Sequence, residues 1–216
     1  MELYDTLKKY KYQILLLLIV ITIFIFSNNS NNVKLINYDN KYTDKNTVHS
    51  YINQYDKILR KLKNKKINVI EIGCFQGGSI KLWYDYFEKA TIYGCDIEDN
   101  IKLKEIKNDD RINLYLNEDA YNKEYVNKYF KDKKFDFMLD DGPHTLESQK
   151  KFIELYLPML TDNGIFVIED IQDIKHIKEL IEVTHEEYRN YIKVYDLREN
   201  KGRYDDILFT IDKLNF

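Results

Sequence analysis

The chain has 216 residues, of which 44% are hydrophobic and 14% aromatic. This length supports one ordinary domain and an additional segment, and the hydrophobic content excludes an intrinsically disordered chain. The net charge of -3, from 33 basic and 36 acidic residues, provides no general positive field, so we predict no nucleic-acid partner. Cys74 and Cys95 lack the spacing of a metal site and are expected to be reduced, buried thiols.

An apolar run follows a lysine-rich start. Residues 14–26 are apolar except Thr22, and as a helix they would span about 20 Å at 1.5 Å per residue. A hydrocarbon core requires roughly 17 to 25 residues, so flanking residues would have to lengthen the span. We expect residues 1–27 to form a short hydrophobic helix that anchors a single-pass, membrane-associated protein, with both orientations left open. A cleaved secretory signal and an amphipathic or buried helix are the alternatives.

Residues 28–46 are rich in Asn and are interpreted as a polar linker, so the folded domain is expected to cover residues 47–216. Within this domain, apolar runs alternate with amphipathic segments. The expected strands are 67–73, 90–97, 112–116, 135–140, 164–170, 191–197 and 205–211. The expected helices are 48–63, 77–87, 121–130, 146–160 and 174–188. This alternation predicts an α/β fold with a Rossmann-like, seven-stranded, mostly parallel sheet that ends in an antiparallel hairpin.

Acidic residues follow the expected strands. In an open α/β sheet, ligands bind outside the carboxyl ends of the strands, so these residues are candidates for a site. They are Glu71, Asp96, Asp119, the pair Asp140 and Asp141, and the pair Glu169 and Asp170, with His144 just after the fourth strand. Carboxylates that meet at one edge repel each other and resist desolvation. A purely structural role would therefore require cations or hydrogen bonds.

A glycine-rich loop follows the first strand in "EIGCFQGGS". Glycine lacks a Cβ, so Gly73 and Gly77 would let the backbone approach a ligand closely. Asp96 ends the next strand 23 residues after Gly73, where a carboxylate can bind both hydroxyls of a ribose. Together, the loop and Asp96 favour a nucleoside-containing cofactor, and a tight turn with a helix cap is the alternative.

Two longer stretches resemble known families. "EIGCFQGGSIKLWYDYFEKATIYGCDI" is similar to the first two motifs of class I S-adenosylmethionine-dependent methyltransferases. "FDFMLDDGPHTLESQKKFIELYLPMLTDNGIFVIEDIQD" resembles the macrolide-sugar O-methyltransferases of the mycinamicin and demethylmacrocin type, and the related cephalosporin hydroxylase-like proteins. The resemblance covers residues 68–173. It implies S-adenosylmethionine and Mg²⁺ as cofactors and a small-molecule sugar acceptor, because that family uses magnesium to methylate a sugar hydroxyl.

The resemblance also implies roles for individual residues. It places Asp141, Glu169 and Asp170 at the metal and His144 as the general base. The residues that would face the methyl donor are Glu71, Gly73, Gly77, Ser79, Asp96 and Asp119. Pro143 departs from the family, in which a serine is common at this position, and should stiffen the turn. We expect an acceptor other than a macrolide.

General chemistry is consistent with these roles. A sugar hydroxyl is a poor nucleophile at neutral pH. A bound magnesium ion would acidify it, and an imidazole could remove its proton. We therefore expect a Mg-dependent O-methyltransferase that acts on the sugar of a nucleotide-sugar or glycan. The alternatives are a metal-independent small-molecule methyltransferase and a non-catalytic protein that binds a cofactor or nucleotide-sugar. Homo-oligomer formation is left open.

Overall fold

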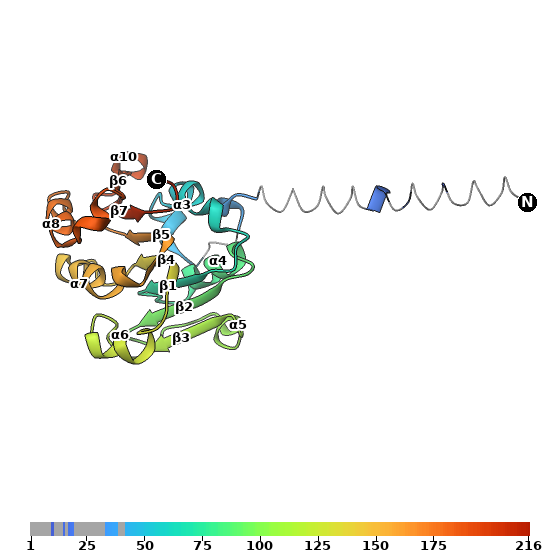
Figure 1. Cartoon of the computed structure of the whole chain (residues 1–216), viewed down its shortest axis with the longest axis horizontal. Coiled ribbons are helices and arrows are strands. Elements are labelled where there is room, and N and C mark those ends of the chain that lie inside the picture. Colours follow the sequence, from blue (N-terminus) through green and yellow to red (C-terminus); the bar gives the residue numbers. More distant parts are fainter. Residues whose placement is uncertain (1–9, 11–14, 16, 20–32, 39–41) are drawn as a thin grey trace, which may run out of the picture.

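The structure is a computed structural model that describes residues 10, 15, 17–19, 33–38 and 42–216. Its strands are β1 (Asn68–Ile72), β2 (Thr91–Asp96), β3 (Ile112–Leu116), β4 (Phe135–Asp140), β5 (Leu160–Ile168), β6 (Ile192–Asp196) and β7 (Ile207–Asp212). They form one seven-stranded sheet in the order β3-β2-β1-β4-β5-β7-β6 (Figure 1). Neighbours from β3 to β5 pair in parallel, whereas β7 is antiparallel to both β5 and β6. The predicted mostly parallel sheet with a closing hairpin is confirmed.

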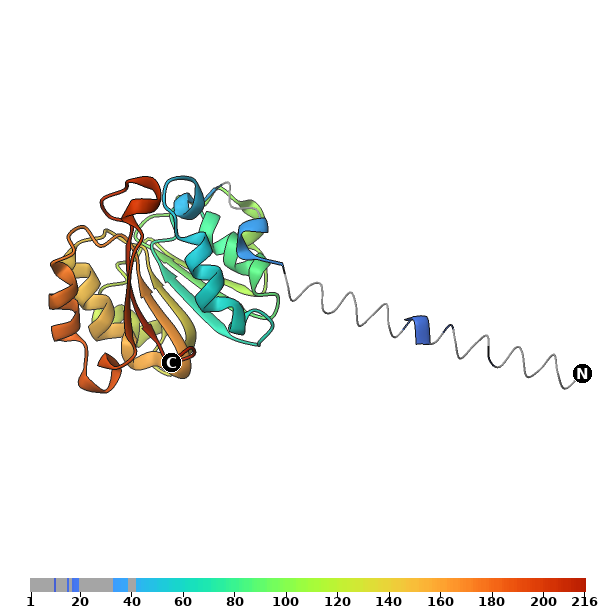
Figure 2. The same cartoon turned by 90° about the horizontal axis from the view of Figure 1, so that it is seen from above.

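Helices cover both faces of this sheet. They are α2 (Asp44–Thr47), α3 (Ile52–Leu59), α4 (Gly78–Tyr86), α5 (Lys104–Lys107), α6 (Lys123–Tyr129), α7 (Leu146–Tyr156), α8 (His176–Val183), α9 (Glu186–Arg189) and α10 (Arg198–Lys201), with 3-10 turns at Leu35–Asn37, Arg60–Leu62 and Leu157–Met159. Helices α3 and α4 lie on one face, and α6, α7 and α8 lie on the other (Figures 1 and 2). Apolar side chains pack in a separate buried layer on each face.

Local sequence signals explain where several helices begin. The Thr145 hydroxyl accepts a hydrogen bond from the backbone N–H of Ser148 at 3.1 Å, which caps α7. Asn122 caps α6 in the same way through the N–H of Glu124, at 2.8 Å. The predicted helix at 174–188 is divided into α8 and α9. The short helices α2, α5 and α10 are not predicted, because one turn of helix leaves no periodic pattern.

Phe137 lies at the centre of one buried layer. Its ring centroid is 5.2 Å from that of Trp83 on α4 and 6.0 Å from that of Tyr55 on α3. All three side chains are essentially inaccessible to solvent. Strand β4 is therefore held by aromatic contacts from two helices.

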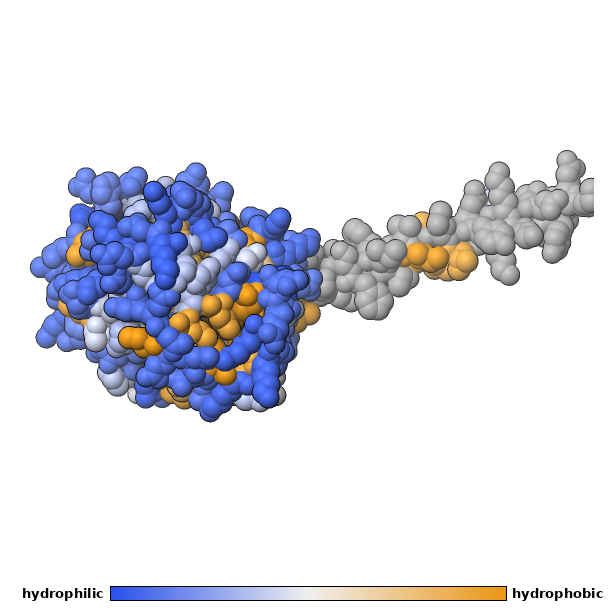
Figure 3. All heavy atoms as spheres, turned by 90° about the horizontal axis from the view of Figure 1, so that it is seen from below, coloured by the Kyte–Doolittle hydropathy of each residue, from blue (hydrophilic) through white to orange (hydrophobic). Residues whose placement is uncertain are grey.

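The face of the molecule in Figure 3 is mostly hydrophilic, with apolar side chains gathered in a smaller area.

Both cysteines are free and buried, as predicted. Burial raises the pKa of Cys95 to about 12 and raises the pKa of Cys74 as well. Both thiols are therefore uncharged at neutral pH and pack as small apolar side chains.

The predicted membrane anchor requires correction. Among the described residues, no helix is long and apolar enough to cross a membrane. Most of the predicted anchor at 1–27 lies outside the described residues. The apolar run at 14–26 would span only about 20 Å as a helix, against about 30 Å for a hydrocarbon core. The prediction of a single-pass, membrane-associated protein is therefore contradicted for the part of the chain that the structure describes.

Strand β4 ends in a buried carboxylate. Asp140 is 2% exposed and accepts a hydrogen bond from the Tyr121 hydroxyl. Burial raises the pKa of Asp140 to about 7, and the Tyr121 hydrogen bond opposes part of that rise. Asp140 therefore faces the interior of the protein, consistent with the expectation that it supports the site rather than binding a metal.

Replacing Phe137 with Ala should lower the free energy of unfolding by about 3–5 kcal/mol, because the change leaves a cavity between β4 and the two helices. Chemical denaturation followed by circular dichroism would measure the change. Phe75→Ala is the matched control, because this side chain is 62% exposed and its loss should change stability by less than about 0.5 kcal/mol. Equal effects of the two substitutions would contradict the assigned core.

Asp140→Asn should change how stability depends on pH. Folded wild type holds the Asp140 proton up to about pH 7, whereas the unfolded chain releases it near pH 4. The wild type therefore loses stability as pH rises through this window, and the variant avoids that loss. Relative to wild type, the variant should gain about 1–3 kcal/mol between pH 5 and pH 8. Asp162→Asn, which alters an almost fully exposed carboxylate, is the control. If the difference in free energy of unfolding between Asp140→Asn and wild type is the same at pH 5 and pH 8, the raised pKa of Asp140 is refuted.

Candidate active site

A cavity of about 870 Å³ opens at the carboxyl ends of β1, β2 and β4. Six of the predicted site residues line it: Gly73, Ser79, Asp96, Asp119, Asp141 and His144. Four others do not: Glu71, Gly77, Glu169 and Asp170. The cavity lies at the predicted edge of the sheet, and it joins the predicted donor-binding loop to the predicted base.

The donor side of the cavity is built from the loop after β1 and the end of β2. A Cβ on Gly73 would lie 2.0 Å from the carbonyl oxygen of Asp141, and the φ angle is +88°, so only glycine fits. The Asp96 carboxylate accepts hydrogen bonds from the backbone N–H groups of Phe75 at 2.7 Å and Glu98 at 3.0 Å. These bonds fix Asp96 at the cavity wall, with a carboxylate available to hydroxyl groups.

Glu71 lies behind the cavity wall rather than in it. It is fully buried, and its Oε2 atom accepts a hydrogen bond from the Trp83 indole at 2.8 Å. Burial raises the Glu71 pKa to about 7, while the Lys45 ammonium lowers it. The observed contacts of Glu71 are therefore with the protein interior, and its predicted role toward the donor stays a prediction.

His144 also lines the cavity, and two carboxylates lie close to its imidazole. Its Nε2 atom is 3.5 Å from Asp170 Oδ2 and 4.0 Å from Asp141 Oδ1. One potential ligand atom from each of these three residues lies within 4.8 Å of the others, so the group could hold a cation or share a proton. His144 and Asp170 both have positive φ angles, 56° and 53°. Such backbone strain in non-glycine residues is common at functional sites.

Two tyrosines hold the carboxylates that follow β5. The Tyr55 hydroxyl donates to Glu169 Oε1 at 2.7 Å, and the Tyr51 hydroxyl donates to Asp170 Oδ1. Burial raises the pKa of both tyrosines, and the adjacent carboxylates raise it further, so the hydroxyls keep their protons. Burial also raises the pKa of Asp170, and His144 opposes that rise. Helix α3 and the residue before it thus fix the positions of these acids.

Lys45 is the site residue that the sequence does not reveal. Its side chain is fully buried, with Nζ 2.6 Å from Asp141 Oδ2, 2.5 Å from Glu169 Oε2 and 3.7 Å from Glu71 Oε1. Burial alone would lower the Lys45 pKa, but the three carboxylates raise it well above its ordinary value. Lys45 lies in the segment interpreted as a linker, and no local pattern marks it.

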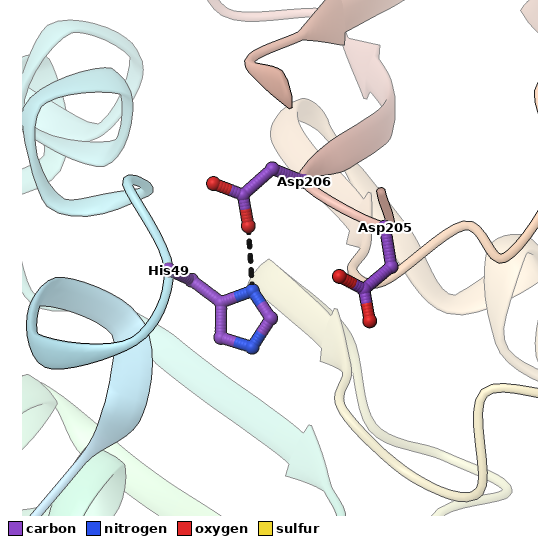
Figure 4. Close-up of side chains that lie close together, drawn as sticks. All are labelled: His49, Asp205 and Asp206. Atoms are coloured by element: carbon purple, nitrogen blue, oxygen red, sulfur yellow. Dashed lines mark hydrogen bonds and ion pairs between the residues drawn. The ribbon is translucent and has the colours of Figure 1, made fainter. Parts of the chain in front are cut away.

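His49 forms a second buried cluster beside this site (Figure 4). Its Nδ1 atom is 2.7 Å from Asp206 Oδ1 and 3.3 Å from Asp170 Oδ1. Asp205 pairs with Arg203 at 3.0 Å. His49, Asp205 and Asp206 also bring potential metal-ligand atoms within 4.8 Å of one another. The cluster connects the segment before α3 to the residues that lead into β7. The sequence does not indicate this contact.

Comparison with known proteins agrees with this architecture. Residues 70–171 match a family described as a methyltransferase domain. Demethylmacrocin O-methyltransferase of Streptomyces fradiae is 30% identical over 135 residues, which are 58% of this chain and 32% of the relative. Mycinamicin VI 2''-O-methyltransferase of Micromonospora griseorubida is 28% identical over 132 residues, 57% of this chain and 32% of the relative. The chain thus spans about a third of the length of these curated relatives.

A solved structure has the same fold. It is MycE methyltransferase from the mycinamycin biosynthetic pathway, in complex with Mg, SAH and mycinamycin VI, with a TM-score of 0.59 and 22% identity. The alignment covers 76% of this chain and 49% of that one. Residues 70–171 therefore match a methyltransferase domain, and the chain resembles the mycinamicin and demethylmacrocin O-methyltransferases.

Proposed function

We propose that this chain transfers the methyl group of S-adenosylmethionine to a hydroxyl group on the sugar of a nucleotide-sugar or glycan. One observation carries the proposal: the glycine loop with Asp96 and the imidazole of His144 line the same cavity. The relatives support the same reaction class, because their names describe O-methyltransferases and some contain the sugar residues olivosyl and rhamnosyl. A cavity of about 870 Å³ is large enough for a donor and a small acceptor together.

Asp96, Gly73, Ser79 and Asp119 are the residues proposed to hold the donor. Asp96 would accept hydrogen bonds from both ribose hydroxyls, because backbone N–H groups already fix its carboxylate. Asp119 lies after β3 at the same edge, with its own carboxylate held by the N–H of Tyr121 at 2.9 Å. When bound, the donor supplies an electrophilic methyl group, and the cavity walls would align that group with the acceptor oxygen.

His144 is the proposed general base. Its Nε2 atom is directed at Asp141 and Asp170, so Nδ1 is the ring nitrogen left to take the proton of the acceptor hydroxyl. As the proton arrives, the imidazole becomes positively charged. The Asp170 carboxylate, 3.5 Å away, would stabilise that charge and hold the ring in place. The attacking oxygen would then bond to the methyl carbon as the carbon–sulfur bond of the donor breaks, with the electron pair of that bond left on the sulfur and the proton left on His144.

The predicted magnesium ligands have unequal surroundings. Asp141 and Asp170 each face His144 with one oxygen. Both oxygens of Glu169 already have partners, because Oε2 binds the Lys45 ammonium at 2.5 Å and Oε1 accepts from Tyr55 at 2.7 Å. A divalent cation bound to all three carboxylates would have to displace that ammonium, so the three-carboxylate arrangement does not fit magnesium. The proposed reaction therefore contains no step that depends on a bound ion.

His144→Ala should lower the rate of methyl transfer by about 10² to 10⁴-fold, because the acceptor hydroxyl loses its base. Binding of S-adenosylmethionine, measured by calorimetry, should stay within about threefold of wild type, since His144 is proposed to contact the acceptor rather than the donor. His185→Ala is the control, because that imidazole is 75% exposed and distant from the candidate ligand groups. Wild-type turnover by His144→Ala, assayed by mass spectrometry of candidate nucleotide-sugars, would refute the role.

Asp96→Asn should weaken donor binding by about tenfold or more, because the amide replaces one acceptor oxygen with a donor group. The measurement is calorimetric titration of the full chain with S-adenosylmethionine. Asp99→Asn is the matched control: it lies three positions further along the chain, and its carboxylate pairs with Lys107 at 2.7 Å outside the cavity lining. Equal affinity of Asp96→Asn and wild type would place the donor elsewhere.

A further inference from the structure

Acidic groups in the cavity wall and behind it meet at one ammonium. Lys45 Nζ lies 2.6 Å from Asp141 after β4 and 2.5 Å from Glu169 after β5, and it is 3.7 Å from Glu71 on β1. The side chains of Lys45 and Glu169 are each 1% exposed, and that of Glu71 is fully buried. Bulk water therefore has little access to Glu71 and Glu169, whereas Asp141 is 18% exposed. A positive charge within the chain lowers the repulsion among the three carboxylates.

The local fold holds Lys45 at this point. The Thr43 hydroxyl accepts a hydrogen bond from the backbone N–H of Lys45 at 3.4 Å, at the start of α2. The preceding carbonyl, that of Tyr42, packs so closely on α4 that a Cβ on Gly78 would lie 2.0 Å from it. His49 fastens the other end of the segment to Asp206, at 2.7 Å. Lys45 therefore enters the carboxylate cluster from a segment fixed on both sides.

An ammonium and a divalent cation cannot share these oxygens. Magnesium binds oxygen ligands at about 2.0–2.1 Å, so an ion bound to Asp141 Oδ2 and Glu169 Oε2 would collide with Nζ and be repelled by its charge. Both oxygens belong to residues that the family resemblance assigns to the metal. Lys45 also lies outside the cavity lining, so it contacts the carboxylates from the interior and leaves the acceptor end to His144.

We propose that the Lys45 ammonium takes the place of the divalent cation, holding Asp141 and Glu169 in position as an internal positive charge. Lys45 is then a positioning residue: it fixes Asp141, and Asp141 with Asp170 orients His144. The consequence for methyl transfer rests on the proposed function, and it is that the reaction proceeds without a divalent cation between Asp141 and Glu169. The charge arrangement itself does not depend on which acceptor is used.

Titration of the full chain with Mn²⁺ by calorimetry tests this inference. Lys45→Met keeps the length of the side chain and removes its charge. The carboxylates then lack a positive partner, so Mn²⁺ affinity should rise by about tenfold or more over wild type. The gain should disappear in Lys45→Met combined with Asp141→Asn. Lys150→Met removes a lysine that pairs with Glu179 at 2.6 Å on the surface, and it should leave Mn²⁺ affinity unchanged.

Mn²⁺ binding by the wild-type chain tests the proposal even if Lys45→Met does not fold. We expect Glu169→Gln not to weaken any Mn²⁺ binding by wild type, because Glu169 binds Lys45 and Tyr55 instead. One Mn²⁺ per wild-type chain that is lost in both Asp141→Asn and Glu169→Gln would overturn the proposal. So would a Lys45→Met chain that folds and gains no affinity. The readout does not involve methyl transfer, so an inactive chain would refute the proposed function without affecting this result.

Discussion

The ion pairs of Lys45 with Asp141 and Glu169 are the interactions on which the site depends. A parallel sheet brings the ends of neighbouring strands together, so the acids after β4 and β5 converge whatever their role. Converging carboxylates that are removed from water cost several kcal/mol each unless a positive charge and hydrogen bonds compensate. Lys45, Tyr51 and Tyr55 provide that compensation from one contiguous part of the chain.

The two oxygens of Asp141 and the two of Asp170 face different partners. Asp141 uses Oδ2 toward Lys45 and has Oδ1 on the side of His144. Asp170 uses Oδ1 toward Tyr51 and has Oδ2 on the side of His144. One oxygen of each acid is thus fixed by the interior, and the other faces the imidazole. This division explains how a rigid, buried cluster can orient a partly exposed base at the end of a cavity.

The sequence predicted the sheet because each strand is a short apolar run followed by turn residues or an amphipathic helix. It also predicted that Asp96, Asp141 and His144 would share one edge, since that follows from parallel strand order alone. It could not predict Lys45, which lies 96 residues from Asp141 and 124 from Glu169 in a polar stretch without periodicity. His49 was missed for the same reason, because its partner Asp206 is 157 residues away. The magnesium expectation came from the resemblance of the fourth- and fifth-strand motifs to a family that uses magnesium, and those motifs carry no information about a distant lysine.

We infer that an internal ammonium, rather than a metal ion, organises the acids beside the cavity. The most direct test is a crystal structure of the full chain grown with S-adenosylhomocysteine and MnCl₂, with data collected at the manganese absorption edge. We expect the nucleoside beside Asp96 and no anomalous peak between Asp141 and Glu169, where Lys45 should remain. An anomalous peak liganded by Asp141, Glu169 and Asp170, with the Lys45 side chain displaced, would contradict the account.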